Sequence, residues 1–196
     1  APDSAGSAGT AGLTLNAAVS SSYVGRYLAA FNDANSANLA STTTWSVTMT
    51  GPGSIATDST KTGARAATGT GATPSIYLFG DGTSGTTTLT WYVGTTSVFT
   101  RTVKFYSTTV STLSATVLKK YVGIPVTGYT EPAGTGGTDA YIAVTAKDSS
   151  GNSVPSLTTL TATSSNTAVV TTQSVVWDAT DLVYYVGLTG VSRGTA

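Results

Sequence analysis

The sequence contains neither cysteine nor histidine, and only 9% of its 196 residues are charged. Without cysteine the chain forms no disulfide, no thiolate metal site and no cysteine nucleophile. Without histidine it has no Ser-His-Asp triad and no histidine-ligated zinc or haem. Glu131 is the single glutamate, so a glycosidase pair of carboxylates would have to come almost entirely from aspartates. These absences predict a protein that is not an enzyme.

The few charges are also balanced, with nine Lys plus Arg against nine Asp plus Glu. A chain without excess positive charge lacks the usual means of binding nucleic acid or anionic membranes. No apolar run approaches the roughly 18 residues that a membrane span needs, so no membrane insertion is expected. Little electrostatic repulsion keeps copies of such a chain apart, which favours self-association.

Serine and threonine make up roughly a third of the chain, and 40% of the residues are hydrophobic. Threonine, valine, tyrosine and tryptophan favour strands, whereas the good helix formers are scarce, so the sequence predicts an all-β fold. Residues 1–12 are small and polar and are expected to form a flexible arm. The start at Ala1-Pro2-Asp3 is typical of a chain cleaved after a signal peptide, which indicates a secreted protein.

Two stretches of the sequence are echoed about a hundred positions later. Residues 15–25 and 113–123 share the spacing Leu-x-Ala-x-Val-x-x-x-Tyr-Val-Gly, and residues 89–94 resemble residues 182–187. Shorter echoes lie between these two in the same order, Val47-Thr48 with Val144-Thr145 and Ser75-Ile76-Tyr77 with Ser174-Val175-Val176. We interpret them as two tandem β-sandwich modules, residues 13–108 and 109–196, each of ordinary sandwich size. A single Thr-rich sandwich with coincidental similarity is the open alternative.

Alternating hydrophobicity places the strands within these modules. In the first module, strands are expected at residues 13–19, 43–50, 75–79, 86–93 and 98–106, and residues 23–31 fit either a strand or a short helix. In the second, strands are expected at residues 113–118, 140–146, 158–163, 169–177 and 182–188, with a loop at 125–139 and a turn at 148–152.

The second module is shorter than the first. After the shared Val-Gly, the first module continues from Thr95 to Thr108, whereas the second has only Leu188 to Ala196. The second module is therefore expected to lack its closing strand. Three explanations remain open: the chain is a piece of a longer protein, another chain supplies the strand by β-augmentation, or this module is complete without it.

Residues 140–155, AYIAVTAKDSSGNSVP, resemble the repeated Ig-like domains of bacterial surface proteins, of the invasin/intimin and bacterial Ig-like type. Asp148, Gly151 and Asn152 match that family's Asp-x-x-Gly-Asn turn, and Val154-Pro155 match the Val-Pro after it. The first module has Gly51-Pro52-Gly53 in place of this turn. The hairpin ending at residues 100–106 is similar to module-closing strands of Thr-rich S-layer-like proteins. The resemblance implies tandem Ig-like antiparallel β-sandwiches that serve as spacers, lattice units or adhesive tips.

From these features we expect a structural protein of the bacterial cell surface, a self-assembling subunit or segment of a surface layer or filament. Its partners would then be copies of itself. The alternative is an adhesin or carbohydrate-binding module that binds cell-wall glycan. Fold alone does not decide between these two functions.

Calcium is the one cofactor for which the sequence offers candidate ligands. Asp148 and Asn152 lie in one turn, and Asp178 and Asp181 lie between two expected strands. Carboxylate and amide oxygens of this kind bind Ca²⁺. Asp and Asn are also ordinary turn residues, which is the competing explanation.

The aromatic residues are the candidate sugar-binding groups. Trp45, Trp91 and Trp177 share strand faces with aliphatic residues, so we expect them in the core. Neighbouring residues of a strand face opposite sides, so one ring of Tyr184 and Tyr185 is expected to point outward. That ring would be available to a partner.

Overall fold

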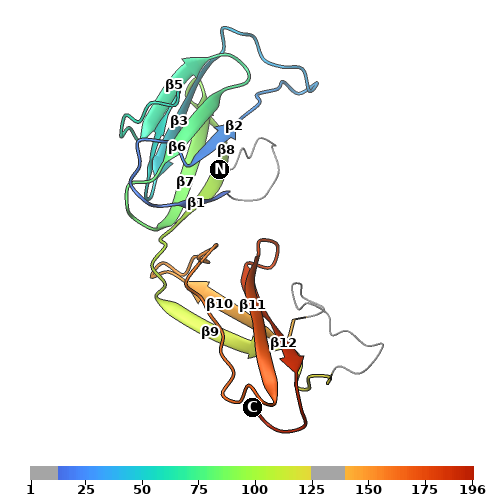
Figure 1. Cartoon of the computed structure of the whole chain (residues 1–196). Coiled ribbons are helices and arrows are strands. Elements are labelled where there is room, and N and C mark those ends of the chain that lie inside the picture. The colour runs from blue at the N-terminus through green and yellow to red at the C-terminus, as the bar shows by residue number, and fades with distance from the viewer. Residues whose placement is uncertain (1–12, 125–139) are drawn as a thin grey trace. The chain divides into compact units, whose positions relative to one another are not determined.

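The computed structural model describes residues 13–124 and 140–196, and every regular element in these ranges is a β-strand (Figure 1). The expected all-β fold is confirmed. The chain divides into two compact units, one of Ala1–Thr108 with Ser150–Asn152 and one of Thr109–Ser149 with Ser153–Ala196. The expected arm at 1–12 and the expected loop at 125–139 lie outside the described residues.

The first unit contains two sheets. A five-stranded sheet has the order β1-β8-β7-β3-β5 and a three-stranded sheet the order β2-β6-β4. All neighbours are antiparallel except β1 and β8, which are parallel. The strands are β1 (Leu13–Asn16), β2 (Gly25–Leu28), β3 (Thr44–Thr50), β4 (Ser54–Ala56), β5 (Ala66–Thr70), β6 (Ser75–Phe79), β7 (Gly85–Val93) and β8 (Thr96–Tyr106).

One apolar cluster fills the space between these two sheets. It takes Trp45, Val47 and Met49 from alternate positions of β3, and it takes Ile76 and Leu78 from β6 in the other sheet. Alternate side chains of a strand point to one face, so the period of two in the sequence becomes one buried face. The first unit is therefore a β-sandwich with a shared core.

Trp91 lies at the centre of that core and is fully buried. Its ring lies 5.7 Å from that of Trp45, 5.8 Å from that of Phe99 and 6.0 Å from that of Phe31. Trp45 is also buried, so the expectation that these two tryptophans belong to the core is confirmed.

The Gly51-Pro52-Gly53 turn between β3 and β4 is held by side chains from elsewhere in the unit. The Asp81 carboxylate accepts hydrogen bonds from the Gly53 and Thr83 amides, at 2.7 and 2.9 Å. The Arg65 guanidinium donates to the carbonyls of Gly51 and Gly53. Gly53 has a φ of 91°, and a Cβ there would lie 2.6 Å from the Phe105 ring, so the turn requires glycine.

The second unit is built on one antiparallel sheet with the order β11-β12-β10-β9. Its strands are β9 (Thr112–Val117), β10 (Ile142–Lys147), β11 (Val170–Asp178) and β12 (Val183–Gly190). The core consists of Val144, Ala146, Tyr184 and Val186, and Leu157, Leu160 and Ala162 of an irregular segment pack against it. In the described residues, this segment rather than a second sheet covers the core face.

The strand expected at residues 158–163 is wrong, because the structure has no regular strand there. The segment is held on the sheet by side chains instead. The Tyr184 hydroxyl donates to the Val154 carbonyl at 2.5 Å and accepts from the Leu157 amide at 2.9 Å, and the Thr172 hydroxyl donates to the Ala162 carbonyl. Threonine-rich composition favours strands through side-chain packing, and it does not by itself supply a neighbouring strand edge.

One pairing occurs in both units with the same register. In the first unit Trp45 lies opposite Val93, and in the second Ile142 lies opposite Val186. These residues occupy equivalent positions of the echoes, so the β3–β7 pair corresponds to the β10–β12 pair.

The other echoes lead to different places in the two sheets. β1 pairs with β8 in parallel, whereas β9, its echo, pairs with β10 in antiparallel fashion. β6 lies in the three-stranded sheet, whereas β11, its echo, pairs with β12. The structure thus repeats one strand pair and rearranges the rest.

Candidate functional site: the edge strand β9

Among residues 13–124 and 140–196, β9 forms one end of the second unit's sheet, where it pairs with β10 on one side only. All six of its residues are exposed. Its sequence, TLSATV, contains no charge and no proline, and its register with β10 is unbroken. Edge strands are normally protected by charges, proline or bulges, because their unpaired N–H and C=O groups accept another strand. β9 has none of these protections.

The side chains of β9 extend the core face of the sheet. Leu113 lies opposite Ala146, and Val117 lies opposite Ile142. Ala146 and Ile142 are on the face of β10 that packs in the core of the second unit. Yet Leu113 and Val117 are 57% and 62% exposed. The apolar face of the sheet therefore continues onto its last strand, where these side chains remain accessible to solvent.

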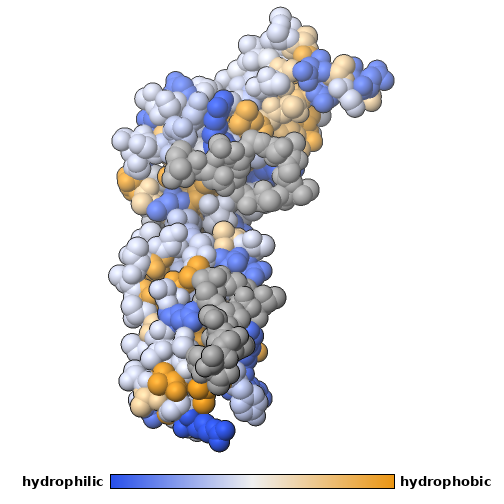
Figure 2. Space-filling model, turned by 45° about the vertical axis from the view of Figure 1, so that its right-hand side comes forward, coloured by the Kyte–Doolittle hydropathy of each residue, from blue (hydrophilic) through white to orange (hydrophobic). Residues whose placement is uncertain are grey.

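The chain after β9 adds further apolar side chains. Leu118, Tyr121 and Ile124 are exposed, and Tyr121 is the most exposed of them at 89%. Five of the ten large exposed apolar residues of the described chain thus fall within residues 113–124. Figure 2 shows exposed apolar side chains in orange. Such a concentration is typical of interaction surfaces and differs from the scattered exposure usual for a protein surface.

β12 is paired on both of its sides, with β11 and with β10. The second module was expected to lack a strand beside β12, but β11 occupies that place. β11 forms the other end of this sheet, and its register shifts between Thr172 and Val175. A shift of this kind bends the strand and weakens it as a template, so β9 is the better acceptor of the two.

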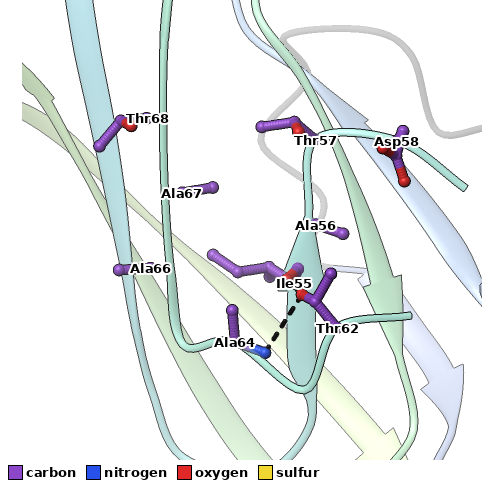
Figure 3. Close-up of a pocket in the computed structure, with 9 residues that line it drawn as sticks. All are labelled: Ile55, Ala56, Thr57, Asp58, Thr62, Ala64, Ala66, Ala67 and Thr68. Atoms are coloured by element: carbon purple, nitrogen blue, oxygen red, sulfur yellow. Dashed lines mark hydrogen bonds between the residues drawn. The ribbon is translucent and has the colours of Figure 1, made fainter. Parts of the chain in front are cut away.

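The hollows that the described residues of the first unit line include three of notable size. One, of about 280 Å³, lies between the end of β4 and β5, and Figure 3 shows the small side chains of Ala64, Ala66 and Ala67 around it. Its one charged residue, Asp58, accepts a hydrogen bond from the Thr60 amide of its own loop. This lining offers few directed groups to a ligand.

The other two hollows are each about 410 Å³. One lies over Trp45 and Gly69 and is lined by threonine, serine and glycine. The other is apolar, lies beside the tip of the β7–β8 hairpin, and is lined by Phe31, Leu39, Val98 and Phe99 among others. The second can take an aliphatic or aromatic group or one face of a sugar ring.

The four candidate calcium ligands occupy two turns. Asp148 and Asn152 are both buried, and the Asn152 amide donates to the Phe105 carbonyl at 2.9 Å. Asp178 accepts hydrogen bonds from the Thr180 and Asp181 amides, which is the geometry of a turn residue. Within residues 13–124 and 140–196, no three acidic side chains gather in one place. Calcium binding stays a prediction.

The tyrosine pair of β12 differs from expectation, because both rings are buried. The two do face opposite sides of the strand, but the Tyr185 hydroxyl turns to Asp181 and donates to its carboxylate at 2.6 Å. This hydrogen bond, together with burial and the charges of Asp181 and Asp178, raises the pKa of Tyr185 to about 12. The prediction that one of these two rings points outward is therefore wrong. Trp177, which was expected in the core, is partly buried and packs against the Tyr184 ring. Among the aromatic residues that the structure describes, the exposed ring is that of Tyr121.

The sequence predicted the strand β9 but did not single it out as a candidate interaction surface. The alternation of Leu113, Ala115 and Val117 looks the same whether that face is covered or open. The clustering of apolar residues through Ile124 was the available signal.

In the part of the chain that the structure describes, no helix is long and apolar enough to cross a membrane. No protein-family model matches this chain, and neither the curated proteins nor the solved structures searched contain a match.

Proposed function

We propose that this protein is a non-enzymatic structural subunit that assembles with copies of itself into an extracellular surface layer or filament. The observation that carries the proposal is the β9 edge, an uncharged strand with open backbone groups and exposed apolar side chains on its core face. A neighbouring chain that adds a strand there would pair the backbone and cover the apolar face at once.

We further propose that the two units are tandem Ig-like domains of the bacterial surface type. Two features support this: the tryptophan-centred core between the sheets of the first unit, and the strand pair whose register recurs in the second. Such modules carry load or spacing without a catalytic site. The low charge suits dense packing of copies, because it keeps repulsion between them small.

Electron microscopy of the purified full chain tests this function. We expect concentrated protein to form sheets, filaments or other regular assemblies. The double variant Leu113→Lys/Val117→Lys, which charges two exposed side chains of β9, should prevent them. Val98→Lys, at an exposed position of β8 in the first unit, is the matched control. Single unassociated particles of the wild type at high concentration would count against the proposal.

A carbohydrate-binding adhesin is the second candidate. It is favoured by the apolar hollow beside Phe99 and by the exposed ring of Tyr121, since aromatic rings stack on sugar faces. Binding of cell-wall glycan fragments by the wild type, with loss in Phe99→Ala or Tyr121→Ala, would establish this function. If the wild type assembles but binds no glycan fragment, the adhesin function is excluded and only the structural role remains.

A further inference from the structure

We infer that two copies of this chain associate through their β9 strands, paired antiparallel about Ala115 as the central residue. This inference rests on the proposed function and specifies the contact that begins the assembly. It follows from three features of β9: the direction of its free backbone groups, the order of its side chains and its lack of charge.

The free backbone groups of β9 belong to alternate residues. The Leu118 amide donates to the Tyr141 carbonyl of the neighbouring chain segment at 2.8 Å, in line with the register of β9 and β10. Hydrogen-bonded and non-hydrogen-bonded positions alternate along an antiparallel pair. The N–H and C=O groups of Leu113, Ala115 and Val117 therefore point away from β10, toward the open edge.

The order of these three residues allows β9 to pair antiparallel with the β9 strand of a second copy. With Ala115 opposite Ala115 of a second copy, Leu113 lies opposite Val117 and Val117 opposite Leu113. All three positions then form hydrogen-bonded pairs, and the small residue lies at the centre, where two identical side chains must meet. The core faces of the two sheets join into one eight-stranded apolar surface. A two-fold contact of this kind is the usual way in which identical chains pair.

β9 carries no charged residue, so no like charges face each other between the two paired strands. Lys147 lies beside one end of the strand, and Lys119 and Lys120 follow the other end. Lys147 and Lys120 are exposed, and Lys119 is partly exposed. The pairing brings Lys147 of one copy toward Lys120 of the other, where water and salt screen the repulsion. One pair of edge strands also buries less surface than a permanent dimer, so the association is expected to depend on concentration.

Cysteine cross-linking tests the register directly, because the natural chain contains no cysteine. In Ala115→Cys the two sulfurs meet across a hydrogen-bonded pair, where the Cα atoms are about 5.5 Å apart and suit a disulfide. Thr116→Cys is the matched control on the same strand, since its side chain points to the opposite face and lies opposite Ser114 instead of its own copy. We expect about tenfold more disulfide-linked dimer from Ala115→Cys than from Thr116→Cys after mild oxidation.

The remaining variants separate the register from the function. Adding Leu113→Lys/Val117→Lys to Ala115→Cys should abolish the cross-link, whereas adding Val98→Lys should not. Circular dichroism of each variant verifies that its sheets are intact. If the wild type assembles but Ala115→Cys and Thr116→Cys cross-link equally or not at all, the Ala115-centred pairing is wrong and the proposed function stands. If the wild type does not assemble at any concentration, both are wrong.

Discussion

At the scale of single residues, the Asp81 carboxylate stabilises the Gly51-Pro52-Gly53 turn from a distant part of the chain, by accepting a hydrogen bond from the Gly53 amide. Partial burial acts to raise its pKa, but the amides of Gly53 and Thr83 and the charge of Arg65 outweigh burial and hold the pKa of Asp81 below its ordinary value. The charged form is therefore the one that stabilises the folded state.

Asp81→Asn should destabilise the first unit by about 1 kcal/mol at neutral pH, because two amide hydrogen bonds lose their charged acceptor. The contribution of Asp81 is present above the carboxyl's unfolded pKa of about 4 and is lost as pH falls through the lower folded value. Urea unfolding at pH 7 and pH 3 measures this. The stability difference between wild type and variant should shrink at pH 3, and an undiminished difference would contradict the role assigned to the charge.

Tyr185 gives the opposite pH dependence. Its folded pKa of about 12 exceeds the ordinary value of 10, so the folded state keeps a proton that the unfolded state loses. The stabilisation is complete below pH 10 and is lost as pH rises toward 12. Tyr185→Phe should remove a tyrosine ionisation step near pH 12 in an ultraviolet titration of the folded protein, whereas the exposed-ring variant Tyr121→Phe should retain it. Persistence of that step in Tyr185→Phe would refute the assignment.

At the scale of elements, alternation in the sequence identifies the strands that form cores. β3, β6, β7, β8, β10, β11 and β12 all lie within a few residues of their expected positions. β4 and β5 were missed, because Ser54–Ala56 is short and Ala66–Thr70 contains no large apolar residue. Period and propensity report which face a side chain covers. They do not predict whether a strand edge is available for a segment to pair with. For this reason residues 158–163 were wrongly expected to form a strand.

In the second unit, hydrogen bonds of the Tyr184 hydroxyl, and not pairing with a strand edge, hold the irregular segment on the sheet. Tyr184→Phe removes both the donor to Val154 and the acceptor for Leu157, leaving two backbone groups without that partner. We expect a loss of about 1–3 kcal/mol in the second unit's stability. Hydrogen exchange should show the Leu157 amide losing protection before the amides of β10 do. Equal protection of that amide in wild type and variant would show that the hydroxyl does not hold the segment.

The candidate site was only partly predictable at this scale. An open strand edge in the second module was expected from its short end, whereas the free edge that best accepts a strand is β9, at that module's beginning. The sequence echo equates β9 with β1, yet the two lie at different places in their sheets, because strand pairing depends on contacts distant in sequence.

At the scale of the whole molecule, the scarcity of charge determines how copies should respond to salt. An assembly held by ion pairs weakens when salt screens them, but β9 has no ion pair to lose. Association should therefore persist or strengthen at about 1 M sodium chloride, and sulfate should strengthen it further by favouring apolar burial. Light scattering across salt concentrations measures this. Dissociation by salt would indicate a charged interface elsewhere on the surface.

Sedimentation velocity of the full chain over a wide concentration range tests most directly whether β9 joins copies of this protein. The wild type and Val98→Lys should shift to larger species as concentration rises, whereas Leu113→Lys/Val117→Lys should sediment as a single chain throughout. A wild type that remains a single chain at every concentration, or a double variant that associates as strongly as the wild type, would contradict association through β9.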